Sequence, residues 1–247
     1  MIISFYEEYP TKENLEKLNL INFPTKLYLA AHSFKEFKKY KKQIKSKYVK
    51  EIAYWPLLTK KEGYWFSAFT KRKALKRTIS ELKNTKVPVM WDAELPTHPN
   101  PLLYLTQLFN FFPNRKLINN FVKNHKKIYI AEYFFVNNRL EHLFRFLCLN
   151  FAPKKNLFPM RMAYSSLHDF GTFLMNDEIK KGKQEFKDNF IVAYGTLASG
   201  EDGQHREISL KLLKRDLDLA KKHNVNEVVL YRLGGLNKKY IKILKKY

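Results

Sequence analysis

The chain lacks the features of disulfide-rich and membrane-spanning proteins. A single cysteine, Cys148, excludes an internal disulfide, and its apolar neighbours at helical spacing indicate a packed thiol. No apolar run approaches the roughly 18 residues that a spanning helix needs. The first ten residues also lack the charged-then-apolar order of a signal peptide. We therefore expect a cytoplasmic protein without a membrane partner.

Acidic residues are scarce, because 23 Asp and Glu stand against 46 Lys and Arg, which gives a net charge of +23. Such a charge allows nucleic-acid binding through phosphate neutralisation. The lysines, however, are spread over most of the expected helices, as on solvated outer faces, and their abundance also fits a thermophile. No zinc-finger, helix-turn-helix or RNA-binding signature is present. Nucleic acid is thus a conceivable partner that the sequence does not favour.

No Pro/Gly/Ser-rich linker and no low-complexity tract divides the 247 residues. Short β-branched or aromatic runs instead alternate with lysine-rich helical stretches, among them 12–20, 34–48, 71–82, 172–186 and 208–222. The eight expected strands are 2–6, 27–31, 51–55, 87–91, 127–131, 160–164, 190–194 and 227–231. This alternation predicts an α/β fold, a single (β/α)8 TIM barrel in one domain over residues 1–247.

Barrels of this kind carry their chemistry at the carboxyl ends of the strands, and acids and aromatics dominate those positions here. Acids and aromatic faces suit a neutral polyhydroxylated ligand, so we expect a small molecule or an oligosaccharide. The loop after the third strand, with Tyr64 and Trp65, is long enough to form a wall. The expected substrate-binding residues are Glu8, His32, Trp55, Trp91, Tyr164, Tyr194, Tyr231 and Arg232.

Asp92-Ala93-Glu94, after the fourth strand, is the sharpest motif. Residues two apart in a strand point to the same side, so both carboxylates would face the barrel mouth. Their repulsion and partial burial favour a general acid, which we assign to Glu94 with Asp92 as its partner. In the other interpretation Asp92 caps a helix or orders the proline-rich loop, and Glu94 is solvated.

Asp92-x-Glu94 resembles the end of the fourth strand in chitinase-type glycoside hydrolases, and Met162-Ala163-Tyr164 resembles their sixth strand. The resemblance implies a (β/α)8 barrel in which Glu94 is the general acid and Asp92 orients a substrate acetamido group that acts as nucleophile. The chain departs from this family where Val87-Pro88-Val89 replace the earlier aspartates. It also departs at Ser165, where the family has an acid, and at Tyr231-Arg232, where it commonly has a tryptophan.

A second catalytic carboxylate would come from Glu132 after the fifth strand or Glu201 after the seventh. Many retaining glycosidases pair acids after strands four and seven, about 5 to 5.5 Å apart, which here would be Glu94 and Glu201.

Two alternatives stay open. Glu132, His168, Asp169, Glu201 and His205 could form a metal-dependent sugar isomerase or phosphodiesterase. They show no compact ligand spacing, and Arg232 stands where such isomerases usually have an acid, so we expect no metal ion and no cofactor. The chain could also be a non-catalytic binding barrel with a basic surface. Gly234-Gly235, with Arg232 as clamp, would suit a phosphate group.

Overall fold

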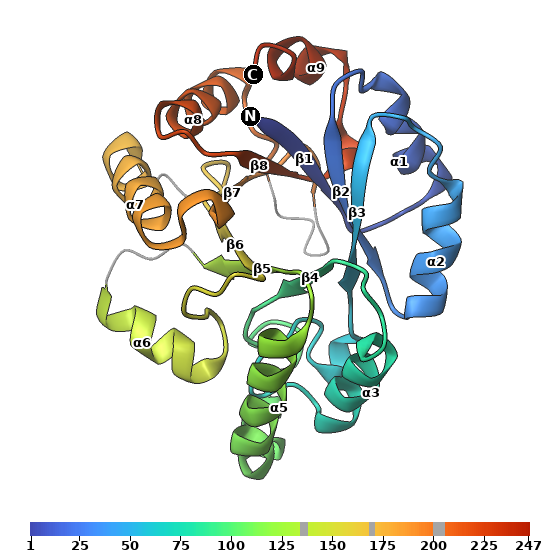
Figure 1. Cartoon of the computed structure of the whole chain (residues 1–247), viewed down its shortest axis with the longest axis vertical. Coiled ribbons are helices and arrows are strands. Elements are labelled where there is room, and N and C mark those ends of the chain that lie inside the picture. Colours follow the sequence, from blue (N-terminus) through green and yellow to red (C-terminus); the bar gives the residue numbers. More distant parts are fainter. Residues whose placement is uncertain (134–137, 168–170, 200–205) are drawn as a thin grey trace.

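A computed structural model describes residues 1–133, 138–167, 171–199 and 206–247. Eight parallel strands form a closed barrel in the order β1 to β8, and β1 pairs with β8 to close it (Figure 1). The strands are β1 Ile2–Glu7, β2 Thr25–Ala31, β3 Val49–Pro56, β4 Val89–Asp92, β5 Ile128–Tyr133, β6 Leu157–Met162, β7 Ile191–Tyr194 and β8 Glu227–Tyr231. The (β/α)8 prediction is confirmed.

Helices surround the strands on the outside (Figure 1). The α-helices are α1 Lys12–Glu16, α2 Phe34–Gln43, α3 Arg72–Leu82, α4 Leu103–Thr106, α5 Phe111–Asn124, α6 Asn138–Leu147, α7 Gly171–Phe186, α8 Leu210–Lys222 and α9 Lys238–Leu244. Short 3-10 helices are η1 Lys17–Leu20, η2 Lys60–Glu62, η3 Leu108–Asn110, η4 Lys187–Asn189 and η5 Leu233–Gly235. In the described part of the chain, no helix combines the length and apolar character needed to cross a bilayer.

The boundaries of several elements differ from the expected ones, most of all in the sixth strand and in the second helix. The sixth strand begins at Leu157, three residues earlier than expected, because Leu157 pairs with Ile128 of β5. It ends at Met162, so Tyr164 lies two residues beyond the strand. The helix expected over 34–48 ends at Gln43. The chain is extended at Ile44 and must return to the sheet, where the Tyr48 carbonyl accepts a hydrogen bond from the Thr25 amide.

Strand alternation divides the apolar side chains into two cores. Val89 and Trp91 of β4 pack outward with the helices, whereas Met90 packs inside the barrel. Inside, aromatic rings of neighbouring strands are in contact, as between Tyr28 and Tyr129, whose ring centroids are 4.9 Å apart. The interior is thus a packed core, and only its ends offer room for polar chemistry.

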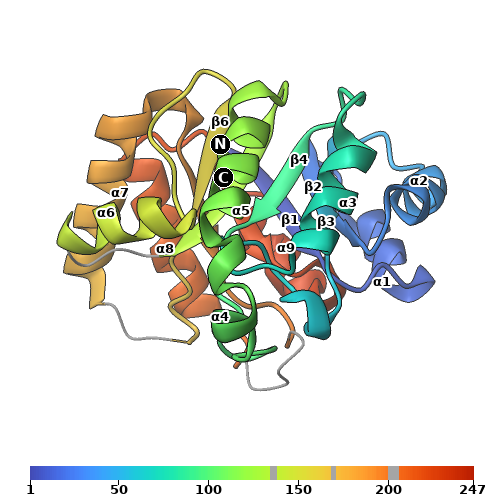
Figure 2. The ribbon, with the colours of Figure 1, turned by 90° about the horizontal axis from the view of Figure 1, so that it is seen from below.

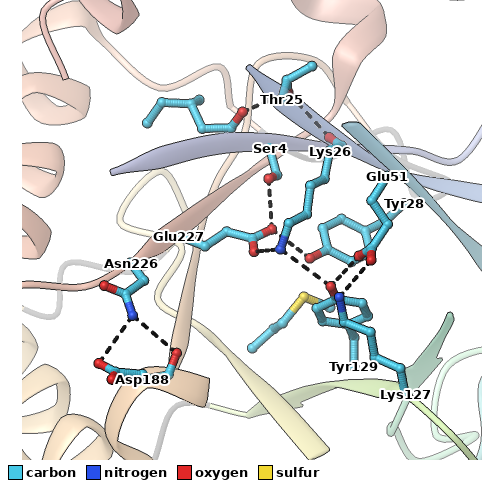
Figure 3. Close-up of polar contacts among 12 residues, drawn as sticks. Ser4, Thr25, Lys26, Tyr28, Glu51, Lys127, Tyr129, Asp188, Asn226 and Glu227 are labelled. Atoms are coloured by element: carbon cyan, nitrogen blue, oxygen red, sulfur yellow. Dashed lines mark hydrogen bonds and ion pairs between the residues drawn. The ribbon is translucent and has the colours of Figure 1, made fainter. Parts of the chain in front are cut away.

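A polar cluster, buried at Glu227 and partly exposed at Glu51, lies at the end of the barrel at which the strands begin (Figure 3). Glu227 accepts hydrogen bonds from Ser4 (2.7 Å) and Tyr28 (2.6 Å) and forms an ion pair with Lys26. Nearby, Glu51 is paired with Lys127 at 2.6 Å and accepts a hydrogen bond from Tyr129. Each acid therefore has a lysine partner at this end.

Candidate active site

A cavity of about 80 Å³ lies at the opposite end, where the strands finish. Figure 2 shows that α4, which follows β4, lies on this side, away from the two chain ends. Six of the predicted site residues line the cavity: Glu8, Trp55, Asp92, Glu94, Tyr164 and Tyr231. None of its described lining residues is Lys, Arg or His.

Asp92 is the last residue of β4, and its side chain is 3% exposed. Burial raises the pKa of Asp92 well above its usual value, and the charges of Glu94 and Glu8 raise it further. The Trp55 indole N–H acts in the opposite direction. The indole of Trp55 is thus close enough to lower the pKa of the Asp92 carboxylate. Neither Trp55 Nε1 nor Asp92 Oδ1 has a hydrogen bond of normal geometry among the described residues, and both atoms are buried.

Glu94 reaches the same cavity from beyond the strand. The Ala93 amide donates a hydrogen bond to the Ala131 carbonyl at 3.1 Å, so the chain stays in register with β5 past Asp92. Asp92 and Glu94 therefore project to the same side, as the sequence predicted. Glu94 is half-buried and accepts a hydrogen bond from the Tyr133 hydroxyl at 3.3 Å.

Glu8 follows β1 and is fixed by two tyrosine hydroxyls. Tyr64 donates to one carboxylate oxygen at 2.5 Å, and Tyr231 donates to the other. Sequence reasoning identified Tyr64 only as part of a loop that could form a wall. Gly63 has φ +121°, a conformation that favours glycine, and it turns the chain just before Tyr64 and Trp65. Trp65 lines the cavity.

Aromatic rings form much of the remaining wall. The Tyr6 ring lies 5.5 Å from Trp55 and 6.3 Å from Tyr231, and Tyr164 lies 6.2 Å from Tyr231, measured between centroids. Burial, together with nearby Asp92 and Glu94, raises the pKa of both Tyr6 and Tyr164, which keeps their hydroxyls protonated. Tyr6 was missed because it lies within its strand; its inward alternation was the available signal.

Trp91 and Tyr194, predicted as binding residues, do not line the cavity. Both side chains point outward from the barrel into the core beneath the helices. Trp91 stacks on Phe66 with centroids 3.9 Å apart. Their places near strand ends were predicted correctly, but each lies on the opposite side from the inward-facing residues Met90 and Ala193.

Glu132, predicted as a catalytic carboxylate, also faces outward and does not line the cavity. Its carboxylate lies 2.8 Å from Arg161, which also pairs with Glu178 of α7 at 3.1 Å. Burial raises the pKa of Glu132 to about 7, although Arg161 acts to lower it. Glu132 therefore belongs to a buried charge cluster between the barrel and α7.

His32 and Arg232 lie outside the cavity. His32 is exposed and lines an adjoining groove, which shares Glu8 with the cavity. Arg232 lies 3.5 Å from Glu7 and stacks on Tyr9. Glu7 also accepts a hydrogen bond from the Gly234 amide at 2.7 Å. The place considered for a phosphate is thus occupied by the Glu7 carboxylate.

Glu201 lies outside the described residues, as do His168, Asp169 and His205 of the metal alternative. Among described residues no group of three or more His, Cys, Asp and Glu side chains is arranged to hold a metal ion. The remaining member of that alternative, Glu132, is paired with Arg161.

Comparison with solved structures finds the same barrel fold in other proteins. No protein-family model matches the chain, and no curated protein sequence matches it. A GH18 chitinase from Pseudoalteromonas aurantia is similar in structure, with a TM-score of 0.58 and 8% identity over 99% of this chain and 98% of the other. A D-tagatose 3-epimerase-like protein gives a TM-score of 0.55 and 13% identity over 100% and 97% of the two chains. The Bacillus megaterium spore cortex-lytic enzyme SleL gives 0.51 and 11% over 97% and 73%. At these identities the likeness concerns the fold.

Proposed function

We propose that this protein is a carbohydrate-active enzyme of the glycoside-hydrolase type, with Glu94 as general acid. The observation that carries the proposal is the convergence of Glu8, Asp92 and Glu94 on one aromatic-lined cavity at the carboxyl ends of the strands. Carboxylates supply acid–base groups and accept hydroxyl hydrogen bonds, while aromatic faces stack on sugar C–H surfaces.

The residues of the chitinase-type resemblance support this assignment. Asp92, Glu94, Met162 and Tyr164 come from two strands that are not neighbours, yet all four line the same cavity. Ser165, which stands where that family has an acid, instead donates a 2.5 Å hydrogen bond to Asp216 of α8. The part of the mechanism that would use an acid at this position therefore falls to another residue.

Asp92 and Glu94 act as a coupled pair that holds a proton. The raised pKa of Asp92 keeps that proton in the cavity, beside Glu94. Glu94 is the more exposed of the two and would pass the proton to the glycosidic oxygen as its bond to the sugar carbon breaks. The negative charge left on the pair then faces the positive charge that develops on the sugar ring.

Glu8 is our candidate for the second carboxylate, in place of Glu132. Its two hydrogen bonds from Tyr64 and Tyr231 fix the orientation of both oxygens. A carboxylate held in this way can activate a water molecule or stabilise the sugar cation. Glu201, the other predicted candidate, remains a proposal from the sequence.

The test is turnover of a panel of aryl glycosides and short oligosaccharides by the wild-type protein and by Glu94→Gln. We expect Glu94→Gln to lower kcat by about 10²- to 10⁴-fold, because glutamine keeps the shape but cannot donate a proton. Glu13→Gln, on the exposed first turn of α1, is the matched control and should turn over normally. Unchanged turnover in Glu94→Gln would remove it from the mechanism. Wild-type binding without turnover would instead favour the non-catalytic barrel.

A further inference from the structure

We propose that this protein docks on an anionic membrane surface through an apolar patch at the end of the barrel where the strands finish. The patch consists of five exposed side chains: Leu102, Leu105, Leu108, Phe109 and Phe112. The inference goes beyond the proposed function and does not depend on it. The sequence led us to expect no membrane partner because no segment is long enough to span a bilayer, but docking on a surface requires no spanning segment.

Exposed apolar side chains are concentrated on one side of the barrel. Among the described residues, twelve Ile, Leu and Phe side chains are exposed, and ten of them lie in the segments that follow β4, β5 and β6. Phe109 of the patch is 93% exposed. Phe112 also contacts the ring of Phe146 of α6, with centroids 6.2 Å apart. Single exposed residues of this kind are ordinary, whereas a gathered set marks an interaction surface.

The patch is the outer face of a segment whose inner face is packed. Its members other than Leu108 are spaced by three, four and three residues along α4, η3 and the start of α5, which keeps them on one side of consecutive helical turns. Between them, Leu103 and Phe111 are buried, and the Phe111 ring lies 5.1 Å from Phe69, measured between centroids. The exposed face is thus held in place by the packing beneath it.

The same segment is anchored beside the cavity. The Asn100 side chain donates a hydrogen bond to the Lys61 carbonyl at 3.3 Å, and a Cβ atom added to Gly63 would lie 3.4 Å from the Leu103 side chain. Lys61 and Gly63 belong to the loop that brings Trp65 to the cavity. Figure 2 shows α4 at this end of the molecule. Docking through the patch would therefore turn the end that carries the cavity toward the membrane.

The charge around the patch is positive. Residues 95–131 contain no Asp or Glu but five Lys and Arg. Of these, Arg115 lies over the Phe146 ring at 5.1 Å from its centroid, and Lys116 is exposed. Lys61 of the anchoring loop is exposed as well. Anionic headgroups attract such cations, while apolar side chains enter the boundary between the headgroups and the acyl chains.

A lipid surface fits these features better than other occupants. The acids of two flanking elements are neutralised, because Glu62 of η2 pairs with Arg77 at 2.8 Å and Glu141 of α6 pairs with Arg145. The net charge of +23 opposes the approach of a second copy. Nucleic-acid phosphates would bind the cations but gain nothing from the five apolar side chains. An anionic membrane offers a partner to both.

The experiment is sedimentation of the full chain with lipid vesicles, made of phosphatidylcholine alone or of phosphatidylcholine mixed with phosphatidylglycerol. We expect the wild-type protein to bind the mixed vesicles at least about tenfold more tightly than the neutral ones. Leu105→Ser/Phe109→Ser should weaken binding to the mixed vesicles at least about tenfold, because the two most exposed side chains of the patch can no longer enter the lipid.

Ile2→Ser is the matched control, because Ile2 is an exposed apolar residue at the opposite end of the barrel. It should bind vesicles like the wild-type protein. Circular dichroism checks that both variants are folded. None of the substituted residues lines the cavity, so the result is independent of the glycoside test.

No binding of the wild-type protein to the mixed vesicles, or equal binding by the double variant, would overturn the inference. Equal binding to phosphatidylcholine alone would also overturn it, since the charge around the patch would then have no role. A dimer that analytical ultracentrifugation detects without lipid, and that the double variant loses, would assign the patch to a second copy instead.

Discussion

The two ends of this barrel treat their acids in opposite ways. Where the strands begin, Glu227 and Glu51 are each paired with a lysine and hydrogen-bonded by tyrosines (Figure 3). Where the strands finish, the acids share one cavity whose described lining contains no Lys, Arg or His. The same eight strands run from one end of the barrel to the other. The difference therefore comes from the residues at, and just beyond, the first and last positions of the strands.

The acids where the strands begin serve stability, whereas those where the strands finish are candidates for function. A lysine partner compensates the charge of a buried acid in the folded protein, and the pair helps to hold together the polar cluster where the strands begin. At Asp92, by contrast, folding disfavours the charged form of the carboxylate, as its raised pKa indicates. Buried acids with a raised pKa are typical of sites that exchange protons or bind charged ligands.

The largest change in stability should come from disrupting the polar cluster where the strands begin. In Glu227→Gln, Lys26 loses its counter-charge while its side chain stays 19% exposed, and we expect the free energy of unfolding to fall by about 3 kcal/mol. Urea denaturation measures this loss. The double variant Lys26→Met/Glu227→Gln should recover much of it, since no uncompensated charge remains. An equal loss in both variants would contradict the ion-pair explanation.

A smaller loss is expected for Glu132→Gln in the cluster outside the barrel. Burial opposes the charge of Glu132 and raises its pKa to about 7, although Arg161 acts to lower it, so the ion pair with Arg161 is only partly favourable. We expect a loss of about 2 kcal/mol, with kcat and KM unchanged because Glu132 faces α7. A large fall in kcat with normal stability would instead return Glu132 to the active site.

The smallest effect should have the opposite sign and appear at the cavity. The pKa of Asp92 is raised in the folded protein, so its favourable contribution is complete below the ordinary value of 3.8 and is lost as the pH rises through the folded-state pKa. Asp92→Asn should therefore stabilise the protein by about 1 kcal/mol at neutral pH and have no such effect near pH 3.8. Denaturation at the two pH values checks this. Destabilisation at neutral pH would show that the charged form is favoured.

Strand and helix periodicity was sufficient to predict the barrel and to bring Asp92 and Glu94 to one face. It also located Glu8, Trp55, Tyr164 and Tyr231, which all line the cavity. Trp91, Tyr194 and Glu132, which were also predicted, face away from the cavity for one reason. A residue near a strand end can point into the barrel or toward the helices, and a shift of one residue reverses its side.

The sequence by itself determined the order of the elements, the closed barrel and the acids at the ends of its strands, because these depend on local periodicity and on residue type. The tertiary structure decided which acids have a cation. Lys26 and Glu227 are 201 residues apart, and Arg161 and Glu132 come from adjacent strands whose register no local pattern fixes. Charge compensation depends on such distant pairings. The contrast between the lysine-paired cluster where the strands begin and the acidic cavity where they finish is therefore visible only in the folded chain.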